Sequence, residues 1–399
     1  MHYQPPASPV SRLPLWSLPD HWRRVLWLGI VIGVVSAISG AIVMPERMWL
    51  NVAMAQQWML SLSLGAMVFL AILYAVRAGW HVALRRVPEA MAGTLPLAVG
   101  MTALLAFGLG WVYPWAAVSA GDHGHALSPA KATWLSPAFV LIRVALCLGV
   151  WWLFMRVLRG HSLQQDEDRD PEHSRVLQRT SIGFLVVYAL TFSLLAFDLM
   201  MSLSPHWFST IFGIYQFCGS FLSAVAVVAL LTIALRTAGA LPMIRDDHLQ
   251  NLGRLILAFC AFQAWVWYSQ FMLIWYANIP EETSWYVLRM SGGWEPIFAV
   301  TPVLCWVLPV LMLLPRSAKR NKHMLAWSAA VVLAGQWLDR YLLIMPEHQP
   351  NGPQFGFLEL GMLVGLIGLF LLGFFTVFAR HRPVPVGDPW LPESLSLHI

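Results

Sequence analysis

Ten apolar stretches recur along this chain, each with about the 20 residues that a helix needs to cross a hydrocarbon core of roughly 30 Å. Hydrophobic residues make up 58% of the sequence and charged residues 11%, which excludes an ordinary water-soluble globular protein. The sequence therefore predicts an all-α polytopic membrane protein with ten transmembrane helices. The spans are expected to begin near Val25, Trp58, Pro96, Pro137, Thr180, Trp207, Asn251, Pro296, His323 and Phe355.

Basic residues are distributed unevenly between the loops that join these stretches. If the N-terminus and every second loop lie on one side, nearly all Arg and Lys fall on that side, and the other side holds Arg47, Lys131 and Arg289. Loops rich in Arg and Lys stay in the cytoplasm. We therefore predict a multi-pass protein of a plasma membrane with both termini in the cytoplasm, and no signal peptide is recognisable before the first span.

Corresponding spans in the two halves of the chain share local patterns. The fifth and ninth spans each carry an Asp before a Pro, at Asp198 and Asp339, and the fourth and eighth both open with Pro-x-Phe. This common offset predicts two related four-helix bundles, made of spans 2–5 and 6–9, with coincidence among Pro-rich helix ends as the alternative. The halves differ chemically, because Arg143 in the fourth span corresponds to Pro302 in the eighth.

These spans define the expected domain organisation. A cytoplasmic N-terminal tail covers residues 1–24, the membrane domain covers 25–380, and a loosely held cytoplasmic C-terminal tail covers 381–399. The parts expected within the membrane domain are a peripheral helix and loop at 25–56, a first bundle at 57–205, a second bundle at 206–346 and a peripheral helix at 347–380.

Several ionisable side chains lie within the spans, where a charge is costly and normally faces a bundle interior or water. All of them lie near the outer ends of their spans, so we expect a proton half-channel open to the periplasm and almost no titratable side chain in the cytoplasmic halves. The alternatives are structural roles. Arg143 and Asp198 would form a buried pair that fixes helix register, Arg340 would reach the interface, and Glu359 would be a favourable charge at a helix N-terminus. The candidates for a proton path or buried ion pairs are Arg143, Asp198, His206, Asp339, Arg340 and Glu359.

The stretch from residue 251 to 294 fills with aromatic residues towards its end and stops at Asn-Ile-Pro-Glu-Glu. Aromatic walls with a few polar groups suit a quinone ring, and interfacial packing is the alternative. The abrupt stop is expected at the periplasmic face, where it would form a docking edge. The candidate quinone-pocket wall comprises Trp267, Tyr268 and Gln270. The candidate periplasmic docking residues are Asn278, Glu281 and Glu282.

The sequence lacks the ligand patterns of redox cofactors. Every His lies in a loop, a tail or at a helix end, and no CxxCH, cluster of four Cys or Rossmann glycine pattern occurs. The four Cys lie far apart within apolar runs and are expected to be reduced. We therefore expect no metal and no cofactor in this chain, no catalysis by the chain alone, and no nucleic-acid binding.

Four local sequences, at residues 131–143, 197–217, 267–283 and 313–346, carry a resemblance to a known family. They resemble the ActF family, the second large NrfD-like membrane subunits of alternative complex III, which is the bacterial quinol:cytochrome c oxidoreductase. The resemblance covers about residues 22–379 and leaves out both tails. It implies a bacterial inner-membrane protein with two four-helix bundles and with the first and last helices outside them.

The resemblance also implies partners and shared motif residues. Haem c and iron–sulfur clusters would be held by other subunits, and quinol would be the substrate of the complex. The implied partners are a multihaem cytochrome c subunit, a periplasmic iron–sulfur subunit, a paralogous NrfD-like quinol-binding subunit, small membrane anchors, lipids and a terminal oxidase. Lys131, Arg143, Asp198, Asp339 and Arg340 lie in the shared motifs, for which the resemblance implies a proton path.

The sequence thus favours a cofactor-free structural subunit of a respiratory complex that oxidises quinol and reduces cytochrome c or an equivalent periplasmic acceptor. A periplasm-side proton half-channel is its expected additional role. Two alternatives remain open: a subunit with a quinone pocket of its own, and a secondary transporter whose repeats rock around a substrate site.

Overall fold

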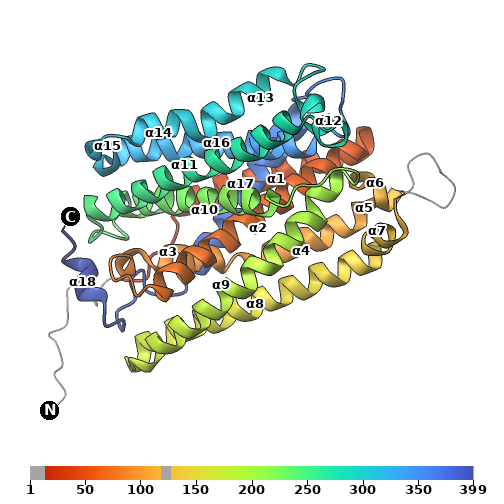
Figure 1. Ribbon diagram of the computed structural model, residues 1–399. Helices are drawn as coiled ribbons and strands as arrows, with labels where there is room; N and C mark the ends of the chain where they lie inside the picture. Colours follow the sequence, from red (N-terminus) through yellow and green to blue (C-terminus); the bar gives the residue numbers. More distant parts are fainter. Residues whose placement is uncertain (1–13, 118–126, 399) are drawn as a thin grey trace, which may run out of the picture.

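The computed structural model describes residues 14–117 and 127–398, and the regular secondary structure in these residues is entirely helical. Nine helical segments in this part of the chain are long and apolar enough to cross a membrane. The long helices run side by side, and both ends of the described chain lie at one end of the molecule (Figure 1), which we call the terminal end. The other end is called the far end. The chain is therefore a helical, membrane-embedded protein of several spans.

The helices differ greatly in length. Their bounds are α1 Asp20–Val43, α2 Pro45–Ala75, α3 Arg86–Ala92, α4 Leu95–Leu105, α5 Leu109–Val112, α6 Pro114–Ala117, α7 Pro129–Trp134, α8 Pro137–Asp168, α9 Glu172–Leu199, α10 Phe212–Thr237, α11 Asp246–Ala277, α12 Pro280–Arg289, α13 Glu295–Pro302, α14 Leu308–Leu313, α15 Arg316–Arg320, α16 Lys322–Ile344, α17 Phe357–Phe378 and α18 Leu391–Leu395. Short turns are η2 Val82–Leu84, η3 Ala106–Gly108, η4 Met201–Leu203 and η5 Val303–Val307.

Helices α2 and α10 form the centre of the molecule and pack against each other. Both are buried along most of their length, whereas the other spans are mostly exposed on one side, as helices facing lipid would be. Helix α2 also contacts α4 and α9, and α8 packs on α9. Helix α10 contacts α11 and α16, and α16 packs on the segment from α13 to α14. Each central helix is thus surrounded by its neighbours in the sequence.

Helix α16 corresponds to the ninth predicted span but is not among the nine apolar segments of the described residues. It has 23 residues, which is long enough to cross a membrane. Its polar side chains, with Gln336, Asp339 and Arg340 in its second half, make it less apolar than the other long helices. These three side chains are buried against α2, α10 and α11, so the polarity of α16 faces protein.

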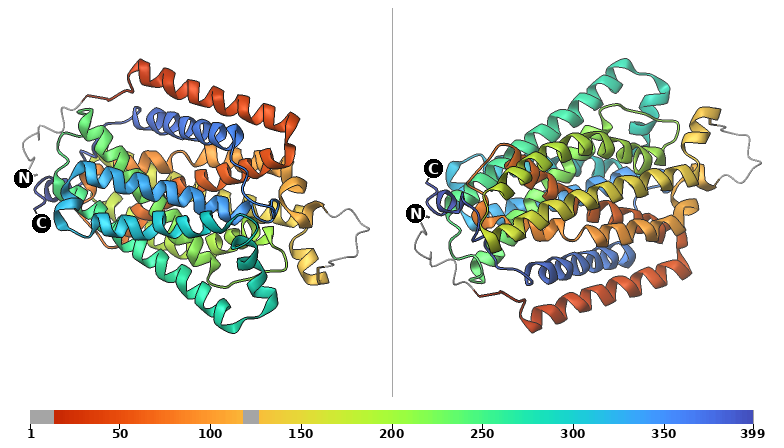
Figure 2. Two further views of the ribbon diagram at one scale, coloured as in Figure 1. Left: turned by 90° about the horizontal axis from the view of Figure 1, so that it is seen from above. Right: turned by 90° about the horizontal axis from the view of Figure 1, so that it is seen from below.

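Helices α1 and α17 lie side by side at one edge of the molecule (Figure 2) and pack closely through small residues. A Cβ atom added to Gly33 would lie only 2.6 Å from the Cα atom of Gly365. Small residues let helix backbones approach closely in a membrane, where dispersion contacts take the place of the hydrophobic effect. The residues that α1 buries are Gly29, Gly33, Ser36 and Gly40, and the glycines of α17 that face them are Gly361, Gly365 and Gly368.

The second span differs from its predicted bounds. The sequence places a loop before residue 57, but α2 begins at Pro45 and is helical throughout this segment. Arg47, Asn51 and Gln56 made the segment look too polar for a span, yet their side chains bond to Glu359 and Thr102 inside the protein. The third span likewise begins early, at Arg86, rather than near residue 96.

The C-terminal tail is not loosely held, as the sequence led us to expect. Asp388 forms a buried ion pair with Arg85, and the hydroxyl of Ser394 accepts from the backbone of Ala83 and donates to the carbonyl of Trp80. Ser394 is fully buried. The Pro-rich composition suggested disorder, but these few polar contacts fix the segment against η2 at the terminal end.

The eighth span is irregular, which the sequence did not lead us to expect. Pro302 lies inside the segment and is followed by the π-helical turn η5. A proline has no N–H to donate, so the backbone can widen after it. Gly335 of α16 packs at this turn, because a Cβ atom there would lie 2.6 Å from the backbone nitrogen of Cys305.

Candidate functional site

Arg143 and Asp198 form a buried two-point ion pair between α8 and α9. Arg143 donates from Nε to Asp198 Oδ2 at 2.8 Å and from Nη2 to Oδ1 at 2.9 Å. Trp134 donates its indole N–H to the same carboxylate at 3.2 Å, and its ring lies 4.1 Å from the guanidinium carbon. The structure thus brings together the two residues that the sequence paired. Two parallel bonds of this kind fix the orientation of both side chains and hold α8 to α9.

Asp339, which like Asp198 lies seven residues before a Pro, has a different environment. Its Oδ1 atom accepts a hydrogen bond from the hydroxyl of Tyr215 on α10. Asp339 is 7% exposed, and no described Arg, Lys or His forms an ion pair with it within 4.0 Å. The carboxylate of Asp339 is thus held by a neutral phenol, whereas that of Asp198 is held by a guanidinium.

Arg340 makes its hydrogen bonds with groups other than its neighbour Asp339. It donates from Nη2 to Ser61 Oγ of α2 at 3.0 Å and from Nη1 to the Gln336 carbonyl at 3.0 Å. Its guanidinium carbon lies 4.5 Å from the centre of the Trp58 ring. The side chain therefore joins α16 to α2 in the interior and does not reach the interface, which was the structural alternative.

A small cavity lies between Arg340 and the ion pair of Arg143 and Asp198. It has a volume of about 20 Å³ and lies between α2, α8, α9 and α10. Ser61, which bonds to Arg340, lines one part of it, and Leu199, which follows Asp198 in the chain, lines another. Gln216 also lines the cavity, and its Nε2 atom is buried without a hydrogen-bond partner in the described residues. The space suffices for one water molecule with polar neighbours.

Glu359 is held in a structural clamp. It accepts from Arg47 Nε at 2.7 Å, from Asn51 Nδ2 at 3.1 Å, and from the backbone N–H of Gly356 at 2.9 Å. The last contact caps the first turn of α17, where a negative charge is also favourable. The carboxylate thus joins α2 to α17, which fits the structural alternative better than a proton carrier. Sequence reasoning missed Arg47 as its partner because it assigned Arg47 to a loop.

The three candidate wall residues of a quinone pocket do not face one cavity. Trp267 stacks on Phe271 with a ring separation of 5.4 Å. Tyr268 is 54% exposed on the outer surface of α11. Gln270 is buried, and its amide accepts from Ser209 and donates to the hydroxyl of Tyr286. The directions of these side chains favour aromatic packing, which was the alternative.

The candidate docking edge lies at the far end, between α11 and α12. Asn278 ends α11 in a left-handed conformation with φ of 49°, and its side chain is exposed. Glu281 is exposed and Glu282 is half-buried, both in the first turn of α12. His206, the last candidate, is exposed in the segment after η4. Their accessible positions would allow contact with a partner.

Arg289 at the end of α12 is a buried anchor that the sequence did not identify. It donates from Nε and Nη2 to the carbonyls of Leu342 and Leu343 at the end of α16, at 3.0 and 3.1 Å. Positive groups are favourable at a helix C-terminus. Burial lowers the pKa of Arg289 to about 10, although the nearby Glu347 carboxylate opposes the shift.

A second buried group of charges, the terminal cluster, lies at the terminal end. Its members are Arg85, Arg86, Glu89, Asp166 and Asp388. Arg85 binds Asp388 and lies 3.3 Å from Glu89, and Arg86 binds both Glu89 and Asp166. The cluster thus ties α3 to the end of α8 and to the C-terminal tail.

The terminal cluster overturns one expectation about the distribution of charge. The halves of the spans near the chain termini were expected to contain almost no titratable side chain, but Arg86 and Glu89 are both 4% exposed there. These residues were read as loop charges that keep a segment in the cytoplasm. One available signal was their spacing, because Glu89 follows Arg85 and Arg86 at the i+4 and i+3 positions that pair on a helix.

Comparison with known proteins gives no assignment. No protein-family model matches the chain, and no curated protein matches it. Among the described residues, no group of three or more His, Cys, Asp or Glu side chains is placed to hold a metal ion. The four Cys are buried and unpaired. The buried charges and the local sequences that carry the resemblance are therefore the features that bear on function.

Proposed function

We propose that this protein is a cofactor-free integral membrane subunit of a respiratory quinol:cytochrome c oxidoreductase of the alternative complex III type, related to ActF. Haem c and iron–sulfur clusters would be held by partner subunits, and the paralogous NrfD-like subunit would bind quinol. The local sequences at residues 131–143 and 197–217 support this proposal. They contribute the two residues of a buried two-point ion pair, Arg143 and Asp198.

We further propose ten spans in two related four-helix units, with α16 as the ninth span. The side-by-side course of α16 and its contacts with α10 and α13 support this arrangement. The first unit would contain α2, α4, α8 and α9, and the second α10, α11, the segment α13 to α14, and α16. The pairing of α1 with α17 supports their place outside both units. The uneven distribution of basic residues supports a cytoplasmic terminal end.

The environment of Asp339 is the observation that supports a proton-conducting role. It is a buried carboxylate whose described hydrogen-bond partner is the neutral Tyr215, so it can gain and lose a proton without first breaking an ion pair. Asp198, by contrast, is held by Arg143. The cavity lined by Ser61, whose hydroxyl binds Arg340, offers a place for one water molecule. We therefore assign proton exchange to Asp339 and a structural role to the pair of Arg143 and Asp198.

Purification of the tagged chain tests the subunit proposal. We expect it to co-purify with haem- and iron–sulfur-containing proteins and with quinol:cytochrome c reductase activity. A stable lone protein without haem absorbance would contradict this expectation and favour the secondary transporter instead.

The Asp339→Asn variant of the assembled complex, reconstituted in liposomes, tests the proton role separately. We expect quinol oxidation to continue while the number of protons released per electron falls. Asp168→Asn, at the end of α8, serves as the control and should leave both unchanged. Unchanged proton release in Asp339→Asn would remove the proton role without affecting the subunit proposal.

A further inference from the structure

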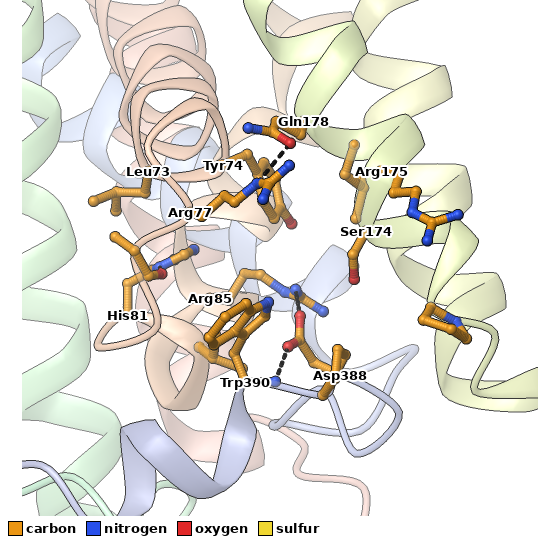
Figure 3. A pocket seen from close by; sticks show the side chains of 15 residues that line it. Leu73, Tyr74, Arg77, His81, Arg85, Ser174, Arg175, Gln178, Asp388 and Trp390 are labelled. Atoms are coloured by element: carbon orange, nitrogen blue, oxygen red, sulfur yellow. Dashed lines mark hydrogen bonds and ion pairs between the residues drawn. The ribbon is translucent and has the colours of Figure 1, made fainter.

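A cavity of about 350 Å³ opens at the terminal end between α2, α9 and the C-terminal tail. Figure 3 shows that its side chains come from three directions: Tyr74 and Arg77 from the end of α2, Ser174 and Arg175 from the start of α9, and Asp388 from the tail. None of these residues belongs to the proposed proton site. The tail that sequence reasoning expected to be loose thus forms one wall of a built cavity.

The cavity is positively charged. Its lining includes the three cations Arg77, Arg85 and Arg175, and Asp388 is the one carboxylate that lines it among the described residues. Arg175 also binds Glu172 at 2.6 Å, so Arg77 is the cation of the lining without a described carboxylate partner. Arg77 has a left-handed backbone with φ of 53°, which is uncommon for a residue with a Cβ atom. Its guanidinium is held over the cavity by Gln178 at 2.8 Å. Backbone strain of this kind is found where the surrounding structure imposes a side-chain direction.

Arg85 supplies hydrogen-bond donors that the protein leaves unused. Its side chain is fully buried, and Nη1 binds Asp388. Its Nη2 atom has no hydrogen-bond partner in the described residues. Figure 3 shows the guanidinium directed into the space between Asp388 and Ser174. A buried, unsatisfied donor of this charge is costly unless an acceptor comes from outside the chain.

The position of the cavity indicates what kind of acceptor it would meet. Leu73 and Tyr74 lie in the last turn of α2, and Pro171 and Ser174 lie at the start of α9, so the cavity lies where two spans end. The N-terminus of α9 adds partial positive charge. Leu73 and Trp390 give the cavity an apolar side. Positive charge beside apolar surface at the level of lipid headgroups suits an amphiphilic anion.

We propose that this cavity binds the phosphate group of an anionic phospholipid. Arg77 and Arg175 hold the phosphate at the rim, Arg85 donates to it from below, and the acyl chains leave along the apolar side. The bound headgroup links α2, α9 and the C-terminal tail. Anionic lipids are preferred over zwitterionic ones because Arg77 forms no ion pair with a described carboxylate and Arg85 keeps an unbound Nη2 atom. This proposal stands apart from the respiratory role, since it uses neither the far-end charges nor a partner subunit.

Native mass spectrometry of the full-length protein in detergent, titrated with dioleoyl phosphatidylglycerol, tests the proposal. We expect one tightly bound lipid, and weaker binding of dioleoyl phosphatidylcholine. The double variant Arg77→Gln/Arg175→Gln should bind phosphatidylglycerol about 30-fold more weakly, as expected for the loss of two basic residues near a membrane surface. Arg179→Gln is the matched control, because Arg179 is exposed on α9 but does not line the cavity.

Three outcomes decide the matter. Weakened binding in the double variant with unchanged binding in Arg179→Gln supports the proposal. Equal binding of phosphatidylglycerol by all three proteins overturns it. If inorganic phosphate alone gives a variant-dependent rise in thermal stability and phosphatidylglycerol gives none, the lipid assignment is wrong and a soluble phosphate compound is the ligand. Should the double variant fail to fold, Arg175→Gln alone, at a side chain 69% exposed, should weaken lipid binding about fivefold.

Discussion

Replacing Asp198 by Asn should destabilise this protein much more than the same change at Asp339. Each of the two acids lies seven residues before a Pro, but their partners differ. Asp198 accepts two hydrogen bonds from the Arg143 guanidinium, whereas Asp339 accepts one from the Tyr215 hydroxyl. Neutralising Asp198 therefore leaves a buried positive charge without its counter-ion.

The structure sets the size of each effect. Breaking one side of a buried ion pair costs about 3–5 kcal/mol, because the remaining charge is uncompensated. Arg143 keeps its contact with the Trp134 carbonyl at 3.0 Å and its position over the Trp134 ring, so we expect the lower end, about 3 kcal/mol. Asn at position 339 can still accept from Tyr215, so its cost should be about 1 kcal/mol.

Unfolding of the purified protein by sodium dodecyl sulfate in mixed micelles measures both free energies. The double variant Arg143→Gln/Asp198→Asn completes the comparison, since it removes both charges. It should be more stable than Asp198→Asn alone, because no buried charge remains unpaired.

Two results would refute the reasoning. One is an Asp198→Asn variant within about 1 kcal/mol of the wild type, which would mean that Arg143 gains water or another acceptor readily. The other is an Asp339→Asn variant that loses more stability than Asp198→Asn. In that case Asp339, and not Asp198, would be the counter-ion on which the fold depends.

Two further predictions concern other parts of the molecule. Gly33→Val should lower the free energy of unfolding by about 1–3 kcal/mol, because the new side chain forces α1 away from α17. Gly149→Val is the control and should cause no such loss, since the space around its Cβ position is open. Equal losses in the two variants would contradict the close packing of α1 on α17. Burial, reinforced by the positive charge of Arg85, lowers the pKa of His81 from 6.5 to about 4, so the folded state binds fewer protons than the unfolded state between these values. The free energy of unfolding should therefore fall by up to about 3 kcal/mol as the pH drops through this range. His81→Asn should remove this part of the pH dependence. Parallel pH profiles of the wild type and the variant in unfolding measurements would show that His81 is not responsible.

The course of the long helices was largely predictable from the sequence, because a span must be apolar over a fixed length. The meeting of Arg143 and Asp198 was also predictable, since both lie at similar depth on consecutive spans. Asp339 and Arg340 were identified as candidates, but their separate partners were not. The spacing of residues in the sequence does not predict which neighbouring helix supplies the hydrogen-bond partner of each of two adjacent side chains.

The sequence was less informative where polar residues pair over long separations. Arg47 and Glu359 were assigned to a loop and a helix end, although they bond to each other across the whole chain. Arg85 and Asp388 form a similar pair, which converts an apparently free tail into part of a cavity. Each residue alone looks like a solvated charge, and only the folded chain shows that it is neutralised by its partner.

The contact between α1 and α17 also has a consequence for biosynthesis. Helix α1 leaves the ribosome before α17, and its glycine-lined face meets its partner only when α17 has been made, more than 300 residues later. At about 5–20 residues per second this interval lasts roughly 15–70 s. During that time the glycine-lined face of α1 faces lipid or an insertion factor, and the contact closes only after α17 has been made. A truncated chain that stops before α17 would therefore carry an exposed helix-pairing surface, which is a feature that membrane quality-control proteases could recognise.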